Sequence, residues 1–221
     1  MKIEKIIFEN RDDAYRQLSD VLPIENMKTD NWIVLATSSG GVPIAITLSK
    51  DLEGEFDFIF TQKVNAAKNE ECEIAIVTET GEIVIHEELM RSFNLDLDEI
   101  YDEANLKYIT DIADYKAKYR DSLDIIDLSN KNVLLIDEGL NTGLTMMACI
   151  KSVINNNAKS ICVAVPVLPS VTKNDIESIA DDLYYVQAPE HFVSIDFYYK
   201  ELEYIGLDKI KILKENNVNN M

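Results

Sequence analysis

Apolar residues gather along the chain in short runs, and stretches with apolar residues at helical spacing separate these runs. Each run is six to eight residues long and bounded by polar or turn-forming residues, which is typical of buried strands. Strands that alternate with helices predict an α/β fold with a doubly wound, mostly parallel sheet. The strand-like runs are residues 32–37, 56–62, 132–137, 160–167 and 182–188, and the helical stretches are residues 11–22, 42–52, 145–155 and 172–180.

Further elements flank this core pattern. Residues 5–8 form a short strand-like run, and Asn10 is placed to cap the helix that follows. Two more strand-like runs, residues 73–79 and 82–86, are joined by a turn. The polar residues before them, 63–71, are predicted to form a loop.

A long helical segment interrupts the alternation. Residues 87–120 contain neither Gly nor Pro and predict a helical insertion that breaks near residues 94–96. The charge of Arg120 is interpreted as an ordinary helix-end charge. Because no linker or repeat is visible, residues 1–221 are expected to form a single domain.

Composition and charge narrow the range of functions. Hydrophobic residues make up 47% of the chain, enough for a substantial core, and the formal net charge is −19. Nucleic acids and anionic membranes are bound chiefly through Lys and Arg, so neither is an expected partner. No apolar run approaches the roughly 18 residues that span a bilayer, and the N-terminus turns charged too early for a signal peptide. We therefore expect a cytoplasmic protein, in which Cys72, Cys149 and Cys162 are buried thiols.

The segment that begins at Asp137 has the most distinctive chemistry. Two adjacent carboxylates, Asp137 and Glu138, precede a short polar turn with two glycines, and a helix follows. In a parallel sheet this turn lies at the carboxyl edge, where ligands bind. Unpaired amides at the start of a helix suit a phosphate, and carboxylates suit hydroxyl groups. Ribose 5-phosphate carries both groups. An ordinary strand-end turn with a threonine cap is the structural alternative.

This segment, Asp-Glu-Gly-Leu-Asn-Thr-Gly-Leu-Thr, resembles the phosphoribosyl-pyrophosphate (PRPP) motif of type I phosphoribosyltransferases. The resemblance implies that Asp137 and Glu138 are catalytic and bind the ribose 2′ and 3′ hydroxyls. It also implies the fold of that family, with a small hood at about residues 184–213. The implied binding residues of the phosphate turn are Gly139, Leu140, Asn141, Thr142, Gly143, Leu144 and Thr145.

A second match lies at residues 37–43, which resemble the pyrophosphate loop of the same family. Related proteins read Pro-Arg-Gly-Gly-Val-Pro there, and Ser39 stands where that arginine would be, so a bidentate cationic contact is missing. A glycine-rich turn that opens a helix explains this loop equally well. The implied pyrophosphate-binding residues are Thr37, Ser38, Ser39, Gly40 and Gly41.

Two other segments resemble parts of these enzymes. Residues 62–71 coincide with the family's mobile loop, where Lys63, and less strongly Lys68, would supply positive charge; a solvated surface loop is the alternative. In the C-terminal segment, Phe192 is the candidate to stack on the base, with Tyr185 as a second. The aromatic residues gathered there could equally form a dimer surface, and we expect a homodimer.

The resemblance implies transfer of a 5-phosphoribosyl group from PRPP to a nitrogenous base, with release of pyrophosphate. Mg²⁺ would be bound mainly through PRPP and pyrophosphate, because this ion keeps several waters and takes few protein ligands. The sequence does not identify the base, and a purine is the default. A non-catalytic sensor that binds PRPP or a nucleotide on the same fold is the alternative, favoured by Ser39.

Overall fold

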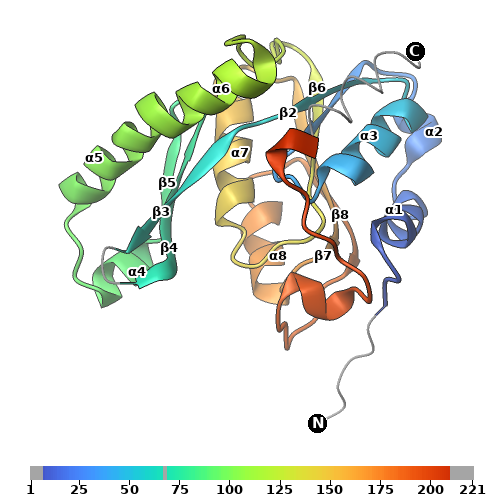
Figure 1. Ribbon diagram of the computed structural model, residues 1–221. Coiled ribbons are helices and arrows are strands. Elements are labelled where there is room, and N and C mark those ends of the chain that lie inside the picture. The colour runs from blue at the N-terminus through green and yellow to red at the C-terminus, as the bar shows by residue number, and fades with distance from the viewer. Residues whose placement is uncertain (1–6, 67–68, 210–221) are drawn as a thin grey trace.

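The computed structural model describes residues 7–66 and 69–209, and its centre is a parallel sheet of five strands in the order β2-β1-β6-β7-β8. All neighbouring strands of this sheet run parallel. The predicted doubly wound α/β architecture is therefore confirmed (Figure 1). The strands are β1 (Trp32–Ala36), β2 (Glu55–Phe58), β6 (Asn132–Ile136), β7 (Ser160–Val167) and β8 (Asp182–Gln187).

Helices cover both faces of this sheet. On one face, Val34 and Leu134 pack with residues of α1 and α3, and on the other, Ile33 and Val133 pack with residues of α7 and α8. Successive side chains of a strand point to opposite faces, so a strand that is apolar throughout is buried on both. Asn10 caps α1 as predicted, because its side chain accepts a hydrogen bond from the Asp13 amide. The helices are α1 (Arg11–Ser19), α2 (Ile24–Met27), α3 (Val42–Asp51), α7 (Leu144–Asn155) and α8 (Ser170–Glu177).

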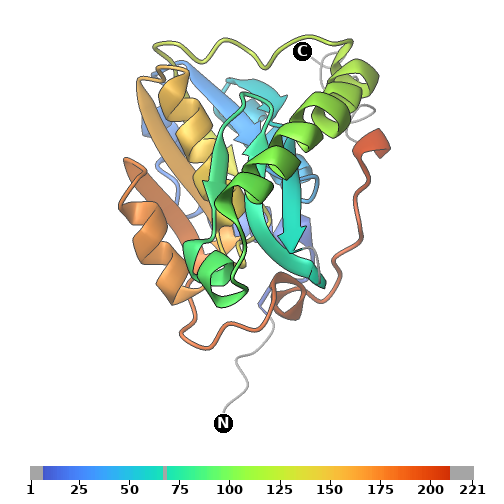
Figure 2. The same cartoon turned by 90° about the vertical axis from the view of Figure 1, so that its left-hand side faces the viewer.

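A second, antiparallel sheet of three strands stands beside the first. Helix α7 packs against one side of it, and α5 packs against the other (Figure 2). We call residues 61–120, which contain this sheet and its helices, the small lobe. Its elements are β3 (Thr61–Ala66), β4 (Asn69–Thr78), β5 (Ile83–Ile85), α4 (Glu87–Ser92), α5 (Leu97–Lys107), the π-helical turn η1 (Tyr108–Ile112) and α6 (Ala113–Arg120).

The small lobe differs from the prediction in two places. The run at 56–62 is not one strand: it breaks after Phe58, and its two parts join different sheets as β2 and β3. The predicted loop at 63–71 is instead the hairpin of β3 and β4, with residues 67 and 68, and hence Lys68, outside the described residues. Strand β3 was not predicted because Val64 and Ala66 are the only apolar residues on its buried face. In the structure they alternate with the exposed Lys63 and Asn65.

The predicted helical insertion at 87–120 is confirmed, and it breaks between Ser92 and Leu97. Two terminal predictions need correction. A strand was expected at residues 5–8. Residues 5 and 6 lie outside the described residues, and Phe8 forms a single parallel bridge with Tyr199 in place of a strand. Residues 184–187, assigned to a hood, belong to the edge strand β8. None of the described helices is long and apolar enough to cross a membrane.

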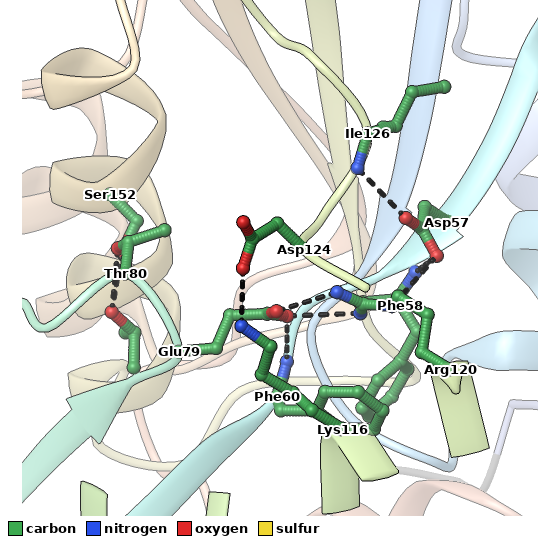
Figure 3. Close-up of polar contacts among 11 residues, drawn as sticks. Asp57, Phe58, Phe60, Glu79, Thr80, Lys116, Arg120, Asp124, Ile126 and Ser152 are labelled. Atoms are coloured by element: carbon green, nitrogen blue, oxygen red, sulfur yellow. Dashed lines mark hydrogen bonds and ion pairs between the residues drawn. The ribbon is translucent and has the colours of Figure 1, made fainter. Parts of the chain in front are cut away.

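Arg120 joins the two sheets and is not a solvated helix-end charge, which corrects the prediction (Figure 3). Its guanidinium donates to both carboxylate oxygens of Glu79, at 2.6 and 3.0 Å, and to the carbonyl of Phe58. Glu79 also accepts from the amide of Phe60 at 2.8 Å. Burial raises the pKa of Glu79, and the Arg120 guanidinium opposes that rise. The network fixes the chain where it passes from β2 into the small lobe.

Candidate active site

A cleft of about 690 Å³ opens at the carboxyl ends of β1 and β6, between their loops and the small lobe. This is the position where ligands bind in open parallel sheets. The cleft is large enough for a nucleotide-sized ligand. Its predicted residues are Thr37, Ser38, Ser39, Lys63, Asp137, Glu138, Gly139, Leu140, Asn141, Thr142, Gly143, Leu144 and Thr145, so the structure brings both predicted loops and Lys63 together.

Asp137 is buried and ties the two loops to each other. One carboxylate oxygen accepts from the Thr37 hydroxyl at 2.8 Å, and the other accepts from the Ser38 hydroxyl and from the Glu138 amide. Burial raises the pKa of Asp137 to about 6, and the hydroxyl donors act against that rise. Each carboxylate oxygen has two lone pairs, so the oxygen that accepts from Thr37 retains capacity for one more hydrogen bond, whereas the other oxygen already accepts two.

Glu138 lines the cleft and is held by Arg11, a residue that the sequence analysis did not single out. Arg11 Nε and Nη2 lie 2.7 and 2.6 Å from the same oxygen, Oε2, of Glu138. Burial raises the pKa of Glu138, and the Arg11 guanidinium opposes the rise. The carbonyl of Glu138 accepts from the hydroxyl of Tyr199 at 2.7 Å.

Gly40 and Gly41 are not among the described cleft-lining residues, yet they are needed for its shape. A Cβ on Gly40 would come within 2.2 Å of the Glu138 carboxylate, and one on Gly41 would come within 2.8 Å of the Asp137 Cα. Real Cβ atoms do not approach other atoms so closely. The two glycines therefore allow the 37–41 loop to lie directly against the acidic pair.

The phosphate turn leads into α7 through Gly143, whose φ of +78° is readily adopted only by glycine. A Cβ there would also come within 2.5 Å of the Thr172 side chain. The Leu144 amide donates to the Thr142 hydroxyl at 3.3 Å. The first amides of a helix have no intrahelical acceptors, and the helix dipole favours an anion beside them. The turn therefore has the backbone geometry of a phosphate site.

The small lobe forms the opposite wall of the cleft. Lys63 projects from β3 and forms an ion pair with Glu73 of β4 at 2.7 Å, so its charge is already matched within the wall. Apolar side chains extend this wall, and periodicity alone could not assign them to a site. They are Phe58, Phe60, Leu89 and Tyr115, joined by Leu207 from the C-terminal segment.

The expected base-stacking aromatics lie elsewhere. The ring of Phe192 stacks on Tyr198 at 5.3 Å, within a cluster that includes Phe8 and Tyr199, and it is not among the described cleft-lining residues. Tyr185 lies under Lys173 of α8, also away from the cleft. Both rings were candidates because the C-terminal segment resembles the base-binding part of type I phosphoribosyltransferases, but in the structure they take part in packing.

The arrangement matches a known family. The family model described as "Phosphoribosyl transferase domain" matches residues 3–201. The chain belongs to this phosphoribosyl transferase domain family. A Mycobacterium tuberculosis protein named "Putative phosphoribosyl transferase MT0597" is 24% identical over 204 residues, which make up 92% of this chain and 45% of the relative. This chain thus spans about half the length of the curated relative that it matches.

Solved structures share the fold of this phosphoribosyl transferase domain. TT1426 from Thermus thermophilus superposes with a TM-score of 0.75 at 22% identity, covering 94% of this chain and 97% of that chain. A hypoxanthine phosphoribosyltransferase from Staphylococcus aureus superposes with a TM-score of 0.50 at 13% identity, covering 86% and 80%. At these identities the likeness establishes the common fold alone.

Within residues 7–66 and 69–209, no group of three or more His, Cys, Asp or Glu side chains could hold a metal ion. The cleft does offer the two carboxylates of Asp137 and Glu138. Magnesium is commonly bound through one or two carboxylates together with substrate phosphates and waters. The residues present therefore fit an ion that arrives with a phosphorylated substrate, not one held in a protein cage.

Proposed function

We propose that this domain transfers the 5-phosphoribosyl group of PRPP to a nitrogenous base and releases pyrophosphate. The observation that carries the proposal is the position of Asp137 and Glu138 beside the turn at 139–145, with the 37–41 loop against them. Acceptors for a diol and donors for a phosphate then lie in one cleft.

In the proposed reaction, the bond from C1′ to the pyrophosphate oxygen breaks, and pyrophosphate leaves with the electron pair. A bond from C1′ to the base nitrogen forms, and the proton on that nitrogen passes to water. C1′ becomes cationic in between, and the carboxylates of Asp137 and Glu138 stabilise it while they hold the 2′ and 3′ hydroxyls. Mg²⁺ bound through PRPP supplies positive charge that offsets the leaving group.

The two phosphate ends of PRPP would be held separately. Residues 140–145 would hold the 5′-phosphate at the start of α7. Thr37, Ser38 and Ser39 would face the pyrophosphate with hydroxyls, and Lys63 would add a positive charge after leaving Glu73. This division fixes the sugar between two anchors, which is how positioning accelerates a transfer reaction.

The acceptor is proposed to be a purine, because a cleft of about 690 Å³ has room for a bicyclic ring beside the sugar phosphate. The wall that includes Phe60 and Tyr115 supplies apolar surface for such a ring. A cytoplasmic location and a homodimer stay predictions. Light scattering of the purified protein tests the dimer.

A second candidate is a sensor that binds PRPP or a nucleotide without turnover. Two observations favour it: Ser39 in place of the arginine, and the Lys63–Glu73 ion pair, which together leave the 37–41 loop without an uncommitted cation in the cleft. The absence of that cation among the described residues weakens the hold on the pyrophosphate more than the hold on the ribose.

One experiment separates the two candidates. The protein is incubated with PRPP, Mg²⁺ and a panel of purine and pyrimidine bases, and pyrophosphate release is measured, with the Asp137→Asn/Glu138→Gln variant as control. Turnover with any base that the variant lacks supports the transferase. Calorimetric binding of PRPP without turnover supports the sensor, and no binding contradicts both.

A further inference from the structure

Arg11 lies behind the cleft and contacts both of the loops that form it. It is the first residue of α1, and its Nε donates to the Gly40 carbonyl at 3.0 Å and to Glu138 Oε2 at 2.7 Å. Its Nη2 lies 2.6 Å from the same oxygen, and only 12% of its side chain is exposed. Such contacts fix both the position and the direction of a guanidinium.

Among the residues that Arg11 contacts, Glu138 is the one described as lining the cleft. Glu138 lines the cleft, whereas Arg11 is not among the described residues that do. Both contacts between Arg11 and Glu138 use Oε2, and no hydrogen bond or ion pair within the described residues uses Oε1, which lies beside Gly40. The carboxylate is thus held by one oxygen from behind and has the other available as an acceptor.

A second contact fixes the backbone of Glu138. The Tyr199 hydroxyl donates to the Glu138 carbonyl, and the Tyr199 ring packs on Phe8 with centroids 5.0 Å apart. The amide of Lys200 donates to the Phe8 carbonyl at 2.9 Å. Segments from near the two ends of the chain therefore meet behind Glu138, and Arg11 and Tyr199 both contact it from this side.

We propose that Arg11 is a positioning residue, which keeps the Glu138 carboxylate ionised and oriented so that Oε1 accepts hydrogen bonds from the ribose diol. This inference rests on the proposed function. The proposed effect on ionisation agrees with the two influences on the pKa of Glu138: burial raises this pKa, and the Arg11 charge lowers it. Without Arg11, burial would act unopposed, and the carboxylate would become protonated at a higher pH.

The test compares Arg11→Met and Arg11→Lys with Arg16→Met, a control in the same helix whose side chain is exposed. The affinities for PRPP, ribose 5-phosphate and pyrophosphate are measured with Mg²⁺ by calorimetry between pH 5.5 and 8. For Arg11→Met we expect the two ribose ligands to bind about tenfold to a hundredfold more weakly, the range typical when a group that orients a ligating side chain is lost. Pyrophosphate, which has no diol, should lose much less affinity than the two ribose ligands, although Arg11 also donates to the Gly40 carbonyl.

The conservative variant and the pH profile separate positioning from a merely structural role. Lysine keeps the charge but not the two-pronged contact, so Arg11→Lys should recover part of the affinity. In Arg11→Met, ribose 5-phosphate binding should also decline at a higher pH than in the wild type. If pyrophosphate binding falls as much as ribose 5-phosphate binding, Arg11 acts on the phosphates and the inference is overturned. Unchanged ribose affinities overturn it as well.

A measurement without PRPP keeps the inference distinct from the proposed function. Carboxyl carbon NMR of the ligand-free protein follows the titration of Glu138, which Arg11→Met should shift to higher pH and Arg16→Met should not. An unshifted titration overturns the role given to Arg11. If the wild type binds no PRPP, the proposed function fails whatever the titration shows.

Discussion

The Glu138 carboxylate lies directly over Gly40, where a Cβ would come within 2.2 Å of Glu138 Cδ. The nearest atoms belong to the end of a flexible side chain, so a methyl group would displace the carboxylate without rebuilding the backbone. That displacement would also break the ion pair between Glu138 and Arg11. The closeness of a glycine and a carboxylate thus makes the loop at 37–41 part of the proposed diol site.

Gly40→Ala should therefore impair binding more than folding. We expect PRPP affinity to fall about tenfold to a hundredfold, the range typical when a ligating side chain loses its orientation. Calorimetry with Mg²⁺ measures the affinity, and thermal unfolding monitors the fold. Gly206→Ala is the matched control, because a Cβ there meets nothing closer than 3.7 Å. Equal affinities of the two variants would contradict the placement of Glu138 at the ligand.

The position of residues 137–145 in a cleft at the sheet edge could be predicted from the sequence, because these residues are neighbours along the chain. The sequence shows two carboxylates, a glycine-bearing turn and a helix start one directly after another. The alternation of strands and helices places this segment at a sheet edge. The same reasoning could not reach Arg11, which is 127 positions from Glu138. Only the packing of α1 brings its guanidinium to the site.

Strand β3 of the small lobe and the role of Phe192 could not be predicted from the sequence. Lys63 belongs to a strand whose apolar face carries only Val64 and Ala66, so the polar residues hide the period of two. Phe192 follows the last strand, where a base could have been stacked, but its ring packs on Tyr198. An aromatic side chain can pack in a core or stack on a ligand, and its position in the sequence does not distinguish these two roles.

Asp137 should make stability and binding depend on pH in opposite directions. Its pKa is raised from 3.8 to about 6 by burial, so between these values the folded state binds more protons than the unfolded state. The contribution of Asp137 to the free energy of unfolding therefore rises as the pH falls from about 6 toward 4. Binding of a diol should weaken over the same interval, because the protonated acid is a poorer acceptor.

Denaturant unfolding of the wild type and Asp137→Asn at several pH values isolates this contribution. The difference between their free energies of unfolding should change in favour of the wild type as the pH falls below about 6. PRPP affinity of the wild type should decline over the same range. A difference that is constant from pH 8 to 4 would show that Asp137 titrates in the folded state as it does in the unfolded chain.

The network around Arg120 should be required for stability. Arg120→Met leaves the carboxylate of Glu79 buried without its ion-pair partner, and breaking such a pair costs about 3–5 kcal/mol. Urea unfolding measures the loss. Arg91→Met is the control, because its ion pair with Glu87 is exposed, and such pairs contribute at most about 1 kcal/mol.

The double variant Arg120→Met/Glu79→Gln removes both charges of this pair, while the buried Asp57 carboxylate, 3.8 Å from Arg120 Nε, stays in place. It should recover part of the stability lost in Arg120→Met, because the amide introduced at position 79 is neutral and leaves no unpaired charge buried at this position. If the double variant is as unstable as the sum of its single variants, the buried charge is not the reason for the loss. The packing of the Arg120 guanidinium over the Phe60 ring, 4.6 Å away, would then be the better explanation.

Substitutions of Lys63 and Glu73 should change the affinity for pyrophosphate in opposite directions. The Lys63 ammonium can pair either with Glu73 or with the ligand. Lys63→Met removes the cation and should weaken binding. Glu73→Gln frees the cation and should strengthen binding by at most about fivefold, because an ion pair whose cation is exposed contributes up to about 1 kcal/mol. Lys151→Met and Glu82→Gln are matched controls from a similar pair at 3.1 Å outside the cleft. Calorimetry with pyrophosphate and Mg²⁺ measures these affinities. If both cleft variants bind pyrophosphate like their controls, Lys63 is a surface charge without a role in binding. The 37–41 loop must then hold the pyrophosphate through hydroxyls and amides alone.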